Sequence, residues 1–278
     1  MQQLHEPYEL TGEQRRFYAQ NHYLKLPQVF DAPTLQHISD VVCAATAKVA
    51  PNQLTPQDVP LTERDTYGQA FIQKMNLWRH DAAAKEVSFS RRLARIACEL
   101  LGVTGVRMYH DQALFKEPGG GITPWHADGY YFPLADGDKC VTAWIPLQPV
   151  PLEMGPLEFS AGSQHIEDGR DVAISKESEE RITESLARAG SVCTHVKEPY
   201  DIGDVSFHSG RIFHRAGANT TDKVRKVMTV IYIDEEMKLA KPTNDGQQND
   251  WNTWCPGIEI GHVIASPLNP VVYSTLRF

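Results

Sequence analysis

The chain has 278 residues, of which 41% are hydrophobic and 22% are charged, so it can bury a core of ordinary size. Its formal net charge of -8 gives no electrostatic reason to bind nucleic acid or an anionic membrane surface. Five cysteines without a CxxC pair argue against a disulfide framework and a thiolate zinc site. The first residues lack a signal-peptide pattern, and no apolar run approaches the ~18 residues that span a bilayer, so we expect a cytoplasmic protein.

Helices dominate the expected structure before residue 103. Thr11 and Gln14 have the spacing of a capping box at the start of the first helix. Apolar residues then recur at helical spacing in the later segments. The pattern predicts helices over 11–20, 31–50 and 81–101.

Short β-rich stretches replace the helices from about residue 104, separated by Gly, Pro, Asn and Asp. Many short strands with such turns are typical of a sandwich or barrel. We predict a single domain with a helical part over about 1–103, a β core over about 104–237 and a coil-rich tail over about 238–278. The strands are expected at 105–116, 139–148, 157–160, 192–197, 203–207, 211–215 and 224–233, with a helical insert at 175–190.

A possible metal site begins in "TPWHADGYYF", where His126 and Asp128 stand two residues apart. On a strand, residues at i and i+2 project to the same face, so both side chains could approach one ion. Spacing alone does not single out this pair, because His165 and Glu167 have it too.

A facial triad requires a second histidine from another strand and leaves three coordination positions open. His214, at the end of the stretch 211–215, is the candidate, and His208 in the same segment is a competitor. The remaining histidines that we weighed are interpreted as structural or surface residues: His110, His165, His195 and His262.

Arg225 lies on an apolar face of the stretch 224–233, which alternates in character. A guanidinium on such a face is costly unless an anion meets it. The anion could be an internal Asp or Glu, or a dicarboxylate cosubstrate whose other end reaches the metal.

Three segments resemble the phytanoyl-CoA dioxygenase superfamily of iron(II)/2-oxoglutarate oxygenases. They are "LFKEPGGGITPWHADGYY", "TAWIPLQPVPLEMGPLEFSAGSQH" and "GDVSFHSGRIFHRAGANTTDKVRKV", and they occur in the family's order over roughly 105–235. The resemblance implies a mainly β, double-stranded β-helix (jelly roll, cupin-like), with the N-terminal helices packed on one sheet.

The same resemblance implies iron ligands and a cosubstrate site. It assigns His126, Asp128 and His214 to Fe(II), and Arg225 to the distal carboxylate of 2-oxoglutarate, with O2 as the other cosubstrate. Asp128 argues against halogenation, because halogenating relatives carry a small residue there. The resemblance further implies that Gln112, Lys116, Thr142 and Trp144 line the cosubstrate site. The alternative is that these four side chains pack within the sheets or lie exposed on the surface.

The predicted activity is hydroxylation of an unactivated C–H bond in a small, largely apolar metabolite, with release of succinate and CO2; desaturation or ring closure is also possible. The alternatives are a metal-dependent cupin-type enzyme, an isomerase or a dioxygenase, that does not use 2-oxoglutarate, and a non-catalytic metal-binding relative. Substrate and oligomeric state stay open. Four aromatic residues could form the wall of the pocket or pack in the core: Trp125, Tyr130, Tyr131 and Phe132. Met154 with the loop 149–156, together with Trp251 and Trp254 in the tail, could close over the substrate as a lid.

Overall fold

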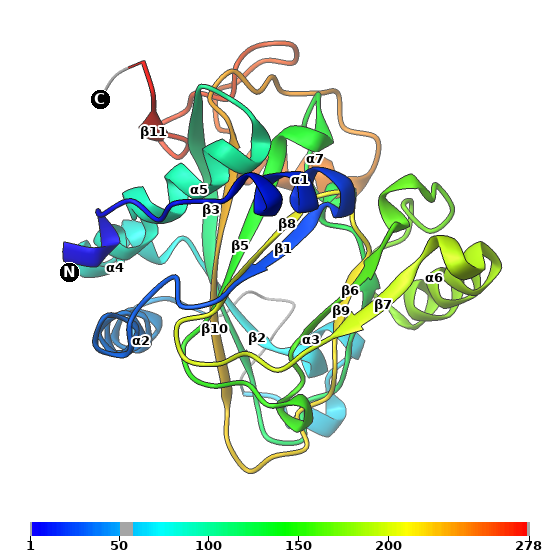
Figure 1. The fold of residues 1–278 in the computed structure, drawn as a ribbon. Helices are drawn as coiled ribbons and strands as arrows, with labels where there is room; N and C mark the ends of the chain where they lie inside the picture. The colour runs from blue at the N-terminus through cyan, green and yellow to red at the C-terminus, as the bar shows by residue number, and fades with distance from the viewer. Residues whose placement is uncertain (1, 51–57, 277–278) are drawn as a thin grey trace.

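Two antiparallel β-sheets face each other in the computed structural model, which describes residues 2–50 and 58–276 (Figure 1). Within these residues the larger sheet has seven strands in the order β1-β8-β5-β10-β3-β11, with β2 also paired to β3. The smaller sheet has four, in the order β4-β9-β6-β7. This arrangement confirms the mainly β prediction.

The strands of the larger sheet are β1 (Tyr23–Leu26), β2 (Ile72–Met75), β3 (Gly105–Lys116), β5 (Cys140–Pro146), β8 (Val205–Ser209), β10 (Arg225–Asp234) and β11 (Val271–Ser274). Those of the smaller sheet are β4 (Thr123–His126), β6 (Leu157–Ala161), β7 (Thr194–Lys197) and β9 (His214–Ala216).

Helices cover the outer faces of both sheets, as Figure 1 shows. On the larger sheet lie α1 (Gly12–Asn21), α2 (Ala32–Thr46), α4 (Ala82–Ser88) and α5 (Arg91–Leu101), while α6 (Lys176–Ala189) covers the smaller sheet. The main core fills the helix side of the larger sheet, where Met228, Val230 and Tyr232 of β10 are fully buried. The opposite face of the larger sheet is not covered by these helices, and it faces the smaller sheet across the interior of the molecule.

The predicted helix over 81–101 is two helices. Asp81 caps α4, and Ser90 caps α5 through its Oγ, which accepts a hydrogen bond from the Leu93 N–H at 3.4 Å. A residue with a side-chain cap has non-helical backbone angles, so the second cap ends the first helix. The capping box at Thr11 and Gln14 is confirmed, with both reciprocal hydrogen bonds present.

The tail contains more regular structure than predicted, with α7 (Asp245–Trp254) and β11 beyond residue 238. Periodicity also missed β1, β2, β4 and the short helix α3 (Thr66–Ala70). Each of these strands has four residues, too few for an alternation pattern to stand out.

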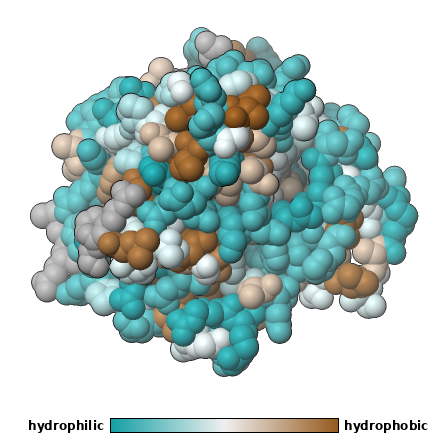
Figure 2. Space-filling model, turned by 90° about the horizontal axis from the view of Figure 1, so that it is seen from above, coloured by the Kyte–Doolittle hydropathy of each residue, from teal (hydrophilic) through white to brown (hydrophobic). Residues whose placement is uncertain are grey.

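The outer surface seen in Figure 2 is mainly polar, and apolar side chains form small separate groups on it. Among the described residues, the search for a helix that is both long and apolar enough to cross a bilayer finds none.

Asp111 ties the helical layer to β3 from a fully buried position. Its carboxylate accepts hydrogen bonds from the backbone N–H groups of Leu77 (2.7 Å) and Trp78 (3.2 Å) and lies 2.5 Å from the Ser88 hydroxyl. Burial raises the pKa of Asp111 to about 6. The folded state therefore keeps this proton to a higher pH than the unfolded chain does.

We expect the stability that Asp111 contributes to fall as the pH rises through about 6, because the folded-state pKa lies above the unfolded value of 3.8. Asp111→Asn imitates the protonated acid and should remove this dependence. Urea unfolding at pH 4.5 and 7.5 should show the wild type losing about 2 kcal/mol more than the variant over this interval. Equal losses in the two proteins would contradict the expectation.

Candidate active site

His126, Asp128 and His214 meet between the two sheets. Their ligand atoms all lie within 4.8 Å of one another. His126 is the last residue of β4 and pairs directly with His214, the first residue of β9. Ala127 is extended (φ −123°, ψ 133°), so the side chains on either side of it point the same way, although Asp128 already begins the 3-10 turn Asp128–Tyr130. The prediction placed His214 at the end of a strand over 211–215, but in the structure it begins β9.

Both imidazoles are oriented for metal binding by backbone carbonyls. His126 Nδ1 lies 2.7 Å from the Pro124 oxygen, and His214 Nδ1 lies 3.1 Å from the Ile212 oxygen. These contacts place the protons on Nδ1 and leave the Nε2 lone pairs for an ion. Burial lowers the pKa of His126 to about 3, so this ring is neutral at physiological pH.

The two oxygens of Asp128 face different partners. Oδ1 lies 3.8 Å from His126 Nε2 and 3.5 Å from His214 Nε2. Oδ2 accepts a hydrogen bond from Thr142 Oγ1 at 3.0 Å and lies 3.4 Å from His208 Nε2. Burial alone would raise the pKa of Asp128, but His214 and His208 outweigh it and hold the pKa well below the ordinary value.

His208, the competing histidine, therefore lies against Oδ2, the carboxylate oxygen that the other two rings do not approach, although its ring centre is only 4.3 Å from that of His214. Its position suits a residue that fixes the orientation of Asp128 better than one that completes the triad. The donor set of two imidazoles and one carboxylate, with one oxygen free to bind, fits Fe(II) with open coordination positions.

Arg225, at the start of β10, is buried without a carboxylate partner among the described residues. Nη1 donates to the Gly155 carbonyl oxygen at 2.5 Å, and the guanidinium carbon lies 5.6 Å from the centre of the Trp144 ring. Nε makes no hydrogen bond to any described residue. Burial lowers the pKa of Arg225 to about 10, so the side chain stays charged. An internal ion pair, one of the two alternatives, is not formed in the described part of the chain.

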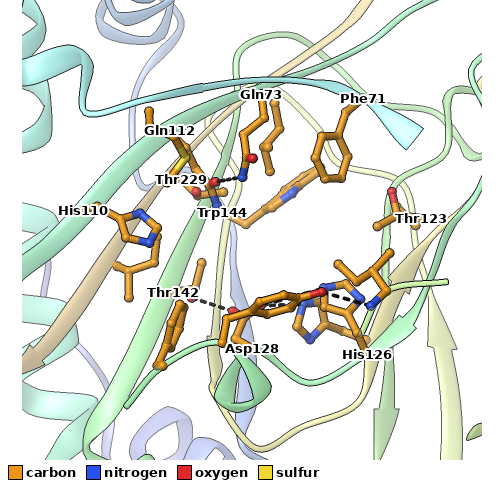
Figure 3. A pocket seen from close by; sticks show the side chains of 18 of the residues that line it. Phe71, Gln73, His110, Gln112, Thr123, His126, Asp128, Thr142, Trp144 and Thr229 are labelled. Atoms are coloured by element: carbon orange, nitrogen blue, oxygen red, sulfur yellow. Dashed lines mark hydrogen bonds and ion pairs between the residues drawn. The ribbon is translucent and has the colours of Figure 1, made fainter. Parts of the chain in front are cut away.

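One cavity of about 210 Å³ joins Arg225 to the triad. Gln112, Thr142 and Trp144, three of the four further residues that the resemblance implied, line this cavity, and their contact with the cosubstrate stays a prediction. Figure 3 shows Gln112 and Trp144 across the cavity from Asp128 and His126. Lys116 is fully buried and paired with Arg225 across the strands, but it is not among the lining residues, since its ammonium donates to the Gly121 carbonyl and lies 3.3 Å from Thr123 Oγ1.

Sequence reasoning missed His110, Thr229 and Asp250 as cavity residues. His110 and Thr229 could have been found by alternation, because they share strand faces with Gln112 and Arg225. Asp250 lies in the unpredicted helix α7, whose start could have been found from Asn244 at the N-cap with Gln247 three residues later. His110 is buried, whereas His165 and His262 are exposed, and His195 lies 2.8 Å from Glu158 away from the cavity.

The aromatic run divides between lining and packing. Tyr131 and Phe132 line the cavity, whereas Trp125 packs beside His195 outside it. In the tail, Trp254 lines the cavity, while Trp251 packs against a neighbouring hydrophobic cluster. Met154, in the loop 149–156, is buried in another cluster. Of these three residues, Trp254 alone is among the described lining residues, and the lid stays a prediction.

Comparison with known proteins agrees with this geometry. Residues 18–227 match the family model for phytanoyl-CoA dioxygenase (PhyH). A probable phytanoyl-CoA dioxygenase of Caenorhabditis elegans is 22% identical over an alignment that covers 82% of this chain and 77% of the relative. The phytanoyl-CoA dioxygenase domain-containing protein 1 of Danio rerio is 25% identical, and the alignment covers 60% of this chain and 58% of the relative.

Solved structures share the fold. The α-ketoglutarate-dependent carbocyclase SnoK from nogalamycin biosynthesis has a TM-score of 0.76 at 23% identity, covering 96% of this chain and 100% of its own. EctD from S. alaskensis has a TM-score of 0.65 at 18% identity, covering 86% and 83%. The chain therefore belongs to the phytanoyl-CoA dioxygenase family, whose members are oxygenases that use Fe(II), 2-oxoglutarate and O2.

Proposed function

We propose that the protein is a 2-oxoglutarate-dependent hydroxylase of a small-molecule C–H bond, with His126, Asp128 and His214 as iron ligands. The observation that carries this proposal is Arg225, a buried cation without a carboxylate partner in the described chain, in the same cavity as the triad. A protein keeps such a charge only where a ligand compensates for its burial. A dicarboxylate that reaches from the guanidinium to the metal does so.

The bound iron, with 2-oxoglutarate and O2, would supply the oxidant and release succinate and CO2. The protein would position the cosubstrate and the metal ligands and would shield the reacting carbon from water. Arg225 would pair with the distal carboxylate, while Trp144 stacks on the guanidinium and limits its rotation. Thr142 and His208 would hold Oδ2 of Asp128, so that Oδ1 faces the ion. Tyr131, Phe132 and Trp254 would keep water from the reacting carbon.

Oxygen transfer is the first choice among the reactions that begin with hydrogen abstraction. Two proteins with this fold are named as a carbocyclase and an epimerase, SnoK and SnoN, so ring closure or epimerisation would use the same groups. A metal enzyme that does not use 2-oxoglutarate is disfavoured, because it gives Arg225 no anion.

Metal-dependent cosubstrate binding tests the proposal. Calorimetry should show that 2-oxoglutarate binds much more tightly with Mn(II) than without a metal, because one end is chelated and the other paired. With Fe(II), oxygen uptake should yield succinate in proportion to the oxygen consumed. Oxygen uptake without succinate would point to the enzyme class that does not use 2-oxoglutarate, and a failure to bind Mn(II) would point to a non-catalytic relative.

A further inference from the structure

We infer that the substrate carries a hydroxyl or amine hydrogen-bond donor, which His110 and Asp250 bind at the end of the cavity away from Arg225. This inference rests on the proposed function. His110 pairs with Ile231, six residues along β10 from Arg225, which separates the two positions by about 20 Å at the usual rise of a strand. A five-carbon dicarboxylate held by Arg225 and the metal cannot also occupy this end.

His110 faces the cavity on the same side of β3 as Gln112, and a β-bulge lies next to it. Ile231 pairs with His110 but Tyr232 pairs with Met108, so Tyr109 is an extra residue in β3. Such a bulge redirects side chains, and here the rings of Tyr109 and His110 lie on the same side, 5.1 Å apart. The imidazole of His110 projects into the cavity in Figure 3.

The His110 ring is ready to bind a ligand. It is 4% exposed, and its Nδ1 has no hydrogen-bond partner among the described residues. Burial lowers the pKa of His110 to about 4, so the ring is neutral and can accept a hydrogen bond at one nitrogen and donate at the other. A buried polar atom left unpaired costs free energy that a substrate hydroxyl or amine would recover.

Asp250 adds a hydrogen-bond acceptor to the same end. It lies in α7 one turn before Trp254, whose ring centre is 5.5 Å from that of His110. The Tyr109 hydroxyl donates to Oδ2 at 3.0 Å, and Trp254 also hydrogen-bonds the side chain. These contacts position the carboxyl group, whose two oxygens can accept further hydrogen bonds. The substrate would therefore meet an acceptor pair at a wall that Phe132 and Trp254 make largely aromatic.

Charge favours a neutral or cationic substrate over an anionic one. Arg225 is the single Lys or Arg among the described lining residues, and the cosubstrate would occupy it. The charges of a divalent ion, Asp128, Arg225 and 2-oxoglutarate then cancel. Burial raises the pKa of Asp250 to about 7, so above this pH its carboxylate would repel a substrate carboxylate. Such a substrate would also meet no free cation among the described lining residues.

Matched fragments can test this inference without turnover. The protein is loaded with Mn(II) and saturating 2-oxoglutarate, and paramagnetic relaxation of fragment protons reports binding near the metal. Benzyl alcohol or benzylamine is expected to bind about tenfold more tightly than toluene, since one additional hydrogen bond contributes that much. Whichever of the two binds more tightly identifies the donor as hydroxyl or amine. Benzoate is expected to bind most weakly.

Variants locate the effect. His110→Phe keeps the ring shape and should lose the tenfold preference for the donor fragments, and His110→Gln should restore part of it. Asp250→Asn should weaken benzylamine most. Asp245→Asn, on the exposed first turn of the same helix, is the control and should change nothing. Toluene binding as tightly as the alcohol and amine, or benzoate binding most tightly, would overturn the inference.

The two proposals fail in different ways. Loss of Mn(II) or 2-oxoglutarate binding in the unchanged protein would refute the proposed function. Normal Mn(II) and 2-oxoglutarate binding, together with fragment affinities that do not respond to His110→Phe and Asp250→Asn, would refute only the assignment of the substrate's donor group.

Discussion

Replacing Asp128 with alanine is expected to raise the dissociation constant for Mn(II) by more than about 100-fold, because the loss of an outer-shell partner alone costs about 10- to 100-fold. Asp128 contributes the single carboxylate of the triad, and its Oδ1 lies 3.8 Å from His126 Nε2 and 3.5 Å from His214 Nε2. Titration of Mn(II) followed by electron paramagnetic resonance measures the change directly. Succinate formation should disappear in parallel.

Glu167→Ala is the matched control, since Glu167 belongs to the rival His-x-acid pair with His165. Glu167 is exposed and lies 3.0 Å from Arg211, and it is not in the metal-site group. Its loss should leave Mn(II) affinity unchanged. Equal weakening by the two substitutions would mean that the ion does not bind at the triad.

Arg225→Met is expected to lower the affinity for 2-oxoglutarate by about 30-fold or more, since truncating one partner of a buried charge pair costs about 2–5 kcal/mol. Without the cosubstrate, the same variant should be as stable as the wild type or more stable. The reason is that the guanidinium is buried with a carbonyl and an aromatic ring but no carboxylate among the described residues. Calorimetry with Mn(II) and urea unfolding measure the two effects.

Arg64→Met provides the comparison for a buried arginine that has a partner. Arg64 Nη1 lies 2.5 Å from Glu117 Oε2, and Arg64 is not among the cavity residues. Its substitution should destabilise the protein without changing the affinity for 2-oxoglutarate. A large loss of stability in the ligand-free Arg225→Met variant would instead indicate that Arg225 serves the fold.

Local pattern predicted the elements that are long enough to show a period. The alternation in 224–233 placed Arg225 on the same face as Thr229 and Ile231, and both line the cavity in the structure. The split between α4 and α5 was missed because both segments continue one apolar stripe. Only the side-chain caps mark the break, and serine is common enough elsewhere to hide it.

The sequence by itself determined which residues are chemically suited to the site, because His, Asp and Arg in those settings have few other uses, and the order of motifs resembled one family. Tertiary structure decided which of them meet. The pairing of His126 with His214, the bulge that brings Tyr109 to the same side as His110 and the approach of Asp250 in α7 all depend on strand register and packing between segments far apart in the chain. Those contacts are non-local, so no window of sequence contains the information that selects them.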